Sequence, residues 1–203
     1  MLTRRSFFVS ALGLPLLPTL PLVEAESVWT KKLVRAARKQ IGVTTGYNPA
    51  YVTLEYPGGD VARETGVCTD VVIRAYRDAF DMDLQVLVHD DMKANFASYP
   101  KTWGLTRADR NIDHRRVPNL ERYFQRQGRE RDAPGTREDW QVGDLITMRL
   151  GGRLPHIAIF SGHDALTGRA LYIHNIGGGT REDELYADYD MPRRFRFAPA
   201  DTA

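Results

Sequence analysis

Residues 65–77 read Thr-Gly-Val-Cys-Thr-Asp-Val-Val-Ile-Arg-Ala-Tyr-Arg and include Cys68, the only cysteine among the 203 residues of the chain. Apolar residues recur at helical spacing from Val71 to Tyr76, which predicts a helix that begins almost at Cys68 and runs to about Phe80. At a helix N-terminus, unpaired backbone N–H groups and the positive end of the dipole favour a thiolate over a thiol. The alternative is that Cys68 is a small buried apolar side chain, which is the commoner role of a free cysteine.

The composition is that of an ordinary globular protein, with 42% hydrophobic and 27% charged residues. The 28 Lys and Arg residues nearly balance the 26 Asp and Glu residues. This balance gives no support for nucleic acid as a partner. The chain contains no zinc-finger pattern and no glycine-rich phosphate loop, so we expect no cofactor.

Residues 1–25 resemble an export signal of the twin-arginine type. A paired arginine lies within Thr3–Phe8, an apolar region follows from Val9 to Val23, and Ala25 offers a small residue for cleavage. Three prolines within the apolar region disfavour a stable membrane span. We therefore expect a periplasmic or otherwise exported protein with the twin-arginine machinery as a partner. The alternative is a general secretory signal in which the two arginines are incidental.

The remaining residues, 26–203, fit a single domain. Helices are predicted over 28–41, 68–80, 84–97 and 120–127, the last with Asn119 as its cap; strands are predicted over 52–55, 144–150, 156–161, 170–176 and 195–197. Because the helices come first and the strands second, the pattern predicts an α+β fold, with N-terminal helices packed on a C-terminal antiparallel sheet.

Two of the five histidines stand at the ends of predicted strands. His156 begins one strand, and His174 ends the next. Neighbouring antiparallel strands can bring these side chains together at one end of a sheet. If the helix that follows Cys68 packs on this sheet, the three residues converge. A thiol, an imidazole base and a group that orients the imidazole are what cysteine hydrolysis needs.

The order of these segments resembles the NlpC-type cell-wall cysteine peptidases and amidases. The segments are the cysteine at a helix start, Gly143–Ile146 on a strand, Pro155–Gly162 on the next, and a polar residue one strand later. The resemblance implies a papain-like fold in which Cys68 is the nucleophile, His156 the base and His174 the residue that orients it. Around the nucleophile this chain has Val-Cys-Thr-Asp where that family usually has Asp-Cys-Ser-Gly.

Longer motifs resemble the bacterial domain of unknown function 1287 family across nearly the whole of 26–203. They are His89–Met92, Asn111–Arg116, Trp140 with Gly143–Leu145, and Ile173–Gly177. That family is exported and grouped with the papain-like superfamily. The resemblance implies an exported cysteine hydrolase that cleaves an amide bond in peptidoglycan peptides or a related cell-envelope substrate.

A charged loop supplies further candidates for substrate binding, namely Asp113, His114, Arg115 and Arg116. Arginine grips carboxylates through two parallel hydrogen bonds, so this loop could line a cleft. It could equally form a knot of salt bridges with Asp90, Asp91 or Asp109.

Two polar residues next to the candidate catalytic groups have competing interpretations. Asn175 follows His174 and faces the opposite side of a strand, so only one of the pair can orient His156; His174 is our choice, and Asn175 remains a candidate for substrate binding. Asp70 lies in the first helical turn, where it favours the helix but raises the pKa of a neighbouring thiol.

Two other functions stay open. One is a zinc-dependent hydrolase that uses histidines with Asp90, Asp91 or Asp113, although the chain has no His-Glu-x-x-His motif. The other is a non-enzymatic envelope protein that keeps a papain-like shell for binding.

Overall fold

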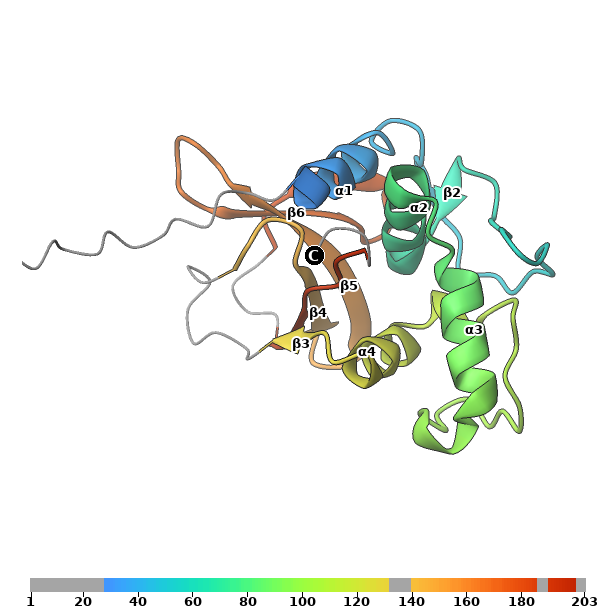
Figure 1. Cartoon of the computed structure of the whole chain (residues 1–203). Coiled ribbons are helices and arrows are strands. Elements are labelled where there is room, and N and C mark those ends of the chain that lie inside the picture. The colour runs from blue at the N-terminus through green and yellow to red at the C-terminus, as the bar shows by residue number, and fades with distance from the viewer. Residues whose placement is uncertain (1–27, 132–139, 186–189, 200–203) are drawn as a thin grey trace, which may run out of the picture.

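Four α-helices and an antiparallel sheet make up most of the computed structural model, which describes residues 28–131, 140–185 and 190–199 (Figure 1). The helices are α1 (Val28–Arg38), α2 (Cys68–Phe80), α3 (Leu84–Ala94) and α4 (Val117–Arg126), and two 3-10 turns are η1 (Phe96–Ser98) and η2 (Asp113–Arg115). The strands are β1 (Gly46–Tyr47), β2 (Thr65–Gly66), β3 (Glu130–Arg131), β4 (Leu145–Leu150), β5 (Leu154–His163), β6 (Ala170–Asn175), β7 (Thr180–Asp183) and β8 (Asp190–Phe195). The predicted α+β class is confirmed, and the segment expected to be an export signal lies outside the described residues.

The main sheet has six described strands in the order β3-β8-β4-β5-β6-β7, all antiparallel. β5 pairs with β4 from Leu154 to Ile159, but with β6 only from Ile159 onwards. The first half of β5 therefore has an edge that β6 does not cover.

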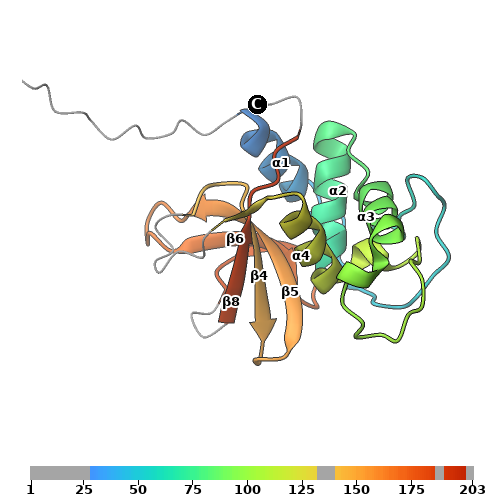
Figure 2. The same cartoon turned by 60° about the horizontal axis from the view of Figure 1, so that its bottom comes forward.

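The two faces of this sheet are covered differently. One face carries Ile157 and Ile159, which pack with α1, α2 and α4 in the larger core cluster. The other face carries Ala158 and Phe160, which pack in a smaller cluster with Trp140. Figure 2 shows the helices gathered on one side of the sheet, with α3 on the side of α2 away from it. Strand alternation explains the division, since successive side chains point to opposite faces.

A fully buried arginine, Arg74, fastens α2 to the loop that precedes it. Its Nε donates to Asp60 Oδ2 at 2.9 Å, its Nη2 to the carbonyl of Thr65 at 3.0 Å, and its Nη1 to Thr44 Oγ1 at 3.1 Å. A buried guanidinium is tolerated only when its donors are satisfied, as they are here. The chain that leads into Cys68 is thereby held against its own helix.

All four predicted helices are present, but some of them begin or end at other residues than predicted. The helix after Cys68 is confirmed as α2. The last helix begins at Val117 rather than after Asn119, because Pro118 suits a first helical turn. The Asn119 side chain donates instead to the carbonyl of Asp113 at 3.1 Å.

Three strand predictions were wrong or missing. Residues 52–55 form no strand, and the backbone N–H of Leu54 donates to Asn111 Oδ1 at 2.9 Å. The final strand, β8, ends at Phe195, where the prediction began. β7 was not predicted, because its sequence, Thr-Arg-Glu-Asp, lacks apolar alternation. Within the described residues, no helix combines the length and apolar character required to span a bilayer.

Candidate active site

Cys68 is the first residue of α2. The preceding turn is tight: a Cβ added at Gly66 would lie 3.1 Å from Arg74 Nη1 and 3.2 Å from Asp70 Oδ2, so only glycine fits without a shift. Asp70, in the first turn, accepts a hydrogen bond at 2.7 Å from the backbone N–H of Val67. The Asp70 carboxylate therefore caps the N-terminus of its own helix.

Burial decides the protonation of Cys68. The residue is 5% exposed, and the pKa of its thiol is raised from 9.0 to about 11, chiefly by removal from water. The charge of Asp70 contributes to this rise, whereas backbone N–H groups of Ile157, Thr69 and Cys68 act against it. The helix N-terminus therefore does not lower the pKa of Cys68 below its ordinary value, and the neutral thiol is favoured.

A buried ion pair joins α2 to the charged loop. Arg115 donates from Nε to Asp70 Oδ1 and from Nη2 to Asp70 Oδ2, both at 2.9 Å, and the two side chains are 2% and 4% exposed. Thr69 Oγ1 donates to the carbonyl of Arg115 at 3.1 Å. Arg115 of the charged loop therefore pairs with Asp70. One interpretation of the sequence had expected the loop to pair with Asp90, Asp91 or Asp109.

The two strand histidines come together, and a carboxylate extends the chain. His156 Nε2 lies 3.1 Å from His174 Nδ1, and His174 Nε2 lies 2.7 Å from Asp183 Oδ1. The two imidazole planes are nearly perpendicular, at 87°. Asp183 is on β7 and was not singled out in the sequence.

Both histidines are neutral at pH 7. Burial and, to a smaller extent, the neighbouring His174 together lower the pKa of His156 to about 3. Burial also lowers the pKa of His174, against the opposing charge of Asp183.

Cys68 meets β5 at its uncovered edge. The backbone N–H of Ile157 is a donor to the sulfur, and Pro155 lines the same pocket as Cys68. His156 lies between these two residues in the strand, and its side chain points to the opposite face from that of Ile157. The strand edge that β6 leaves free is what admits the start of α2.

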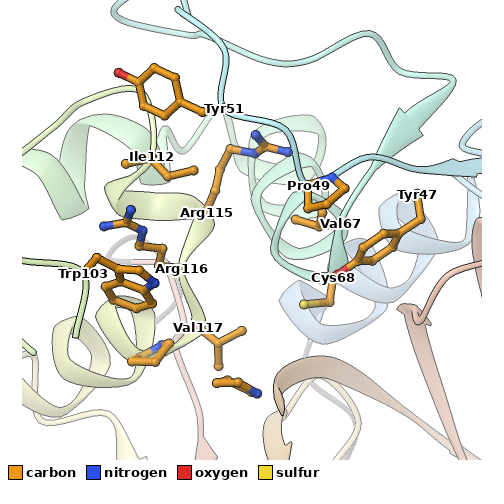
Figure 3. Close-up of a pocket in the computed structure, with 12 residues that line it drawn as sticks. Tyr47, Pro49, Tyr51, Val67, Cys68, Trp103, Ile112, Arg115, Arg116 and Val117 are labelled. Carbon is orange, nitrogen blue, oxygen red and sulfur yellow. The ribbon is translucent and has the colours of Figure 1, made fainter. Parts of the chain in front are cut away.

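A pocket of about 460 Å³ opens beside the thiol (Figure 3). Its lining residues are Tyr47, Pro49, Tyr51, Val67, Cys68, Trp103, Ile112, Arg115, Arg116, Val117, Pro118 and Pro155. Figure 3 shows the Cys68 sulfur turned into the pocket and Trp103 with Arg116 on the opposite side. This volume lies in the range of small-molecule and peptide sites.

Arg116 lines this pocket across from Cys68. Its guanidinium carbon lies 4.1 Å from the centre of the Trp103 ring, a cation–π contact. Its Nη1 is buried and has no hydrogen-bond partner in the part of the chain that the structure describes. Burial lowers the pKa of Arg116, although an arginine stays charged.

Of the predicted residues only Cys68, Arg115 and Arg116 line the pocket, and His156, His174, Asp113, His114 and Asn175 do not. Asp113 accepts from the backbone N–H of Asp109 at 2.6 Å, and His114 is buried with a pKa lowered by burial to about 3. Asn175 donates to the carbonyls of Gly46 and Gly66, both at 3.1 Å, so it holds the loops beside Cys68 rather than a histidine.

Sequence reasoning missed three residues of this site, namely Tyr47, Trp103 and Asp183. The pKa of Tyr47 is raised by burial and then by the charges of Cys68 and Asp70, which places its phenol beside the thiol. Tyr47 and Trp103 come from irregular segments without periodic signals. Asp183 follows a glycine-rich turn nine residues after His174, and a hairpin at that turn would have suggested it.

Metal ligation was one of the functions left open by the sequence. Among residues 28–131, 140–185 and 190–199, no group of three or more His, Cys, Asp or Glu side chains is arranged to hold a metal ion.

The fold and site define an α+β protein with a pocket beside a helix-start cysteine and a hydrogen-bonded His–His–Asp chain on its sheet. Residues 34–197 match the model of the family described as Domain of unknown function (DUF1287), and the chain belongs to that family. It is also 47% identical over 180 residues to Uncharacterized protein YijF of Escherichia coli (strain K12), which covers 89% of this chain and 86% of that protein.

Breaking the buried ion pair should be costly. Arg115→Met leaves Asp70 charged and buried, and we expect it to reduce the free energy of unfolding by about 3–5 kcal/mol. Urea unfolding followed by circular dichroism measures this loss. The control is Arg169→Met, whose partner Glu184 is exposed, and it should cost no more than about 1 kcal/mol. Equal losses in the two variants would contradict the role given to Arg115.

Two buried histidines should make stability fall in acid. His114 and His156 have pKa values of about 3 in the folded state against an ordinary 6.5, so the unfolded chain takes up protons first as the pH falls. Their stabilisation is complete above pH 6.5 and is lost towards pH 3, at about 1.4 kcal/mol per pH unit for each histidine.

Urea unfolding at a series of pH values measures that slope. His114→Asn should reduce it by about 1.4 kcal/mol per pH unit. His163→Asn, at an exposed position of β5, should leave it unchanged. The same slope in both variants would show that His114 does not stay neutral in the folded state.

Proposed function

We propose that this protein is an exported cysteine hydrolase with a papain-like fold, which cleaves an amide bond in peptidoglycan peptides or a related cell-envelope substrate. The observation that carries the proposal is the position of Cys68. Its sulfur faces a pocket at the start of α2, beside a strand whose His156 is bonded to His174. The proposal requires the His156 imidazole to reach the sulfur around the edge of β5. A nucleophile, a base and an orienting group are then available for covalent acyl transfer.

The neutral resting state sets the order of events. With Cys68 at a pKa of about 11 and His156 at about 3, a thiolate–imidazolium pair is disfavoured in the empty site. Proton transfer from sulfur to imidazole therefore accompanies attack on the substrate carbonyl, when the new oxyanion and imidazolium stabilise each other.

The proposed reaction has two covalent stages, acylation of Cys68 and hydrolysis of the thioester. The sulfur forms a bond to the carbonyl carbon, and the His156 imidazolium returns the proton to the amine as the C–N bond breaks. A thioester remains on Cys68. Water, deprotonated by the same imidazole, attacks the thioester, releases a carboxylic acid and restores the thiol.

Donors for the oxyanion lie close to the sulfur. The backbone N–H groups of Cys68 and Thr69 are at the start of α2, where they have no partner one turn earlier. The phenol of Tyr47 is beside the thiol on the pocket wall. Such preorganised donors usually contribute the largest part of transition-state stabilisation.

The pocket favours a substrate that carries a carboxylate. Arg116 brings a positive charge to the wall opposite the sulfur, whereas Arg115 is already paired with Asp70. Peptides of the cell wall carry free carboxylates. Trp103 and Tyr51 supply apolar contact area for the rest of such a peptide.

The proposed substrate agrees with the expected location. A twin-arginine signal over residues 1–25 would deliver the folded protein to the periplasm, where peptidoglycan is found. An exported chain with one thiol keeps that thiol only if it is buried or used.

A binding function without catalysis is the second candidate. Burial of both groups, which raises the pKa of Cys68 and lowers that of His156, is also what an inert core would show. In this case the pocket would hold an envelope peptide without cleaving it.

The two candidates differ in the role of the sulfur. Residues 26–203, incubated with a panel of muropeptides, should release fragments that mass spectrometry detects, and Cys68→Ala should release none. Thermal unfolding of both proteins shows whether the variant is folded. If wild type and variant leave the panel equally intact but bind it with equal affinity, the binding function replaces the hydrolase.

The charge of Arg116 should determine affinity for substrate. Arg116→Gln should raise KM about 10- to 100-fold for a peptide with a free carboxylate, since a hydrogen bond to a charged group is worth about 1.5–3 kcal/mol. The same variant should change KM little for the corresponding amide. Arg110→Gln, an exposed position on the same loop, is the control. Equal KM values for acid and amide in the wild type would show that Arg116 does not bind the carboxylate.

A further inference from the structure

We infer that Asp183 is a positioning residue of this site, because its carboxylate fixes the tautomers of His174 and His156. The inference rests on the proposed function, since it assigns the atom of His156 that accepts the proton from Cys68. Asp183 itself touches neither the sulfur nor the pocket.

The hairpin of β6 and β7 brings Asp183 to the histidines. His174 pairs with Arg181 in the register of the two strands, and Tyr172 pairs with Asp183. Asp183 is thus the diagonal neighbour of His174 on the same face, at a separation that polar side chains can bridge. Its Oδ1 lies 2.7 Å from His174 Nε2, the shortest contact of the chain of groups.

The direction of every hydrogen bond follows from the carboxylate. An ionised carboxylate only accepts, so His174 must carry its proton on Nε2. In a neutral imidazole the other nitrogen is then an acceptor, so His174 Nδ1 accepts from His156 Nε2–H. His156 Nδ1 is left with a free lone pair. One carboxylate therefore makes Nδ1 of His156, and not Nε2, the base.

Asp183 acts on the histidines through the direction of its hydrogen bond more than through its negative charge. The Asp183 side chain is 40% exposed, and Arg181 Nε binds its Oδ2 at 2.8 Å, so solvent and a cation screen its field. The acceptor character of the carboxylate is not screened. Without it, either nitrogen of His174 can carry the proton, and half of the arrangements leave His156 Nδ1 protonated and unable to act as a base.

Nitrogen-15 NMR of the histidine-labelled protein tests the tautomers without reference to activity. In the wild type we expect His156 protonated on Nε2 alone, and His174 likewise. Asp183→Ala should introduce the Nδ1–H form of both rings, and Asp183→Glu should restore the wild-type form. Glu182→Gln is the matched control on the same strand, since Glu182 binds Arg38 instead of a histidine.

Kinetics on a cleaved muropeptide provide the second readout. Asp183→Ala should lower kcat at least about tenfold, below the roughly 10⁴-fold loss that follows when a catalytic histidine is held in the wrong tautomer. KM should stay unchanged, and Asp183→Glu should recover most of kcat.

The outcomes separate the two proposals. Unchanged histidine tautomers in Asp183→Ala overturn the inference, whatever the activity. Altered tautomers together with a lower kcat support it. Altered tautomers in a protein whose wild type cleaves nothing support the assignment of the protons and overturn the hydrolase.

Discussion

The site depends on the buried ion pair between Asp70 and Arg115. Asp70 belongs to the first turn of α2, and Arg115 belongs to the segment that leads into α4, so the pair ties the helix that begins at Cys68 to the opposite wall of the pocket. Two desolvated charges are costly to bury, and good geometry on both oxygens only about offsets that cost. Its effect is therefore better seen in position than in stability: it places Arg116 across the pocket from Cys68.

Burial, with a smaller contribution from the same carboxylate, favours the protonated thiol. The helix dipole favours a charge at a helix end by at most about 2 kcal/mol, and usually by less. The rise in the pKa of Cys68 from 9.0 to about 11 corresponds to on the order of 3 kcal/mol in the opposite direction. Burial comes first in this shift and the Asp70 charge adds to it. Burial and a neighbouring carboxylate thus outweigh the helix dipole and disfavour a thiolate at the start of α2.

The geometry of the sheet places Cys68 and the two histidines on different faces of β5. His156 shares its face of β5 with Ala158 and Phe160, whereas the helices cover the face of Ile157. Cys68 reaches the strand at an edge that β6 leaves unpaired, where the N–H of Ile157 is available. In the proposed mechanism the imidazole of His156 reaches the sulfur around this edge.

The sequence determined what depends on local periodicity: α2 from Cys68, the α+β order, and the strands that carry His156 and His174. It could not determine which charges pair, because Asp70 and Arg115 are 45 residues apart and nothing near either one marks the other. It also missed Asp183, since a four-residue polar strand has no apolar alternation to reveal it. The protonation of Cys68 was decided only by tertiary structure, because burial is a property of everything that packs around a residue. The sequence around Cys68 thus predicted that the thiol lies at the start of a helix. The residues packed around it in the folded protein determine its protonation state.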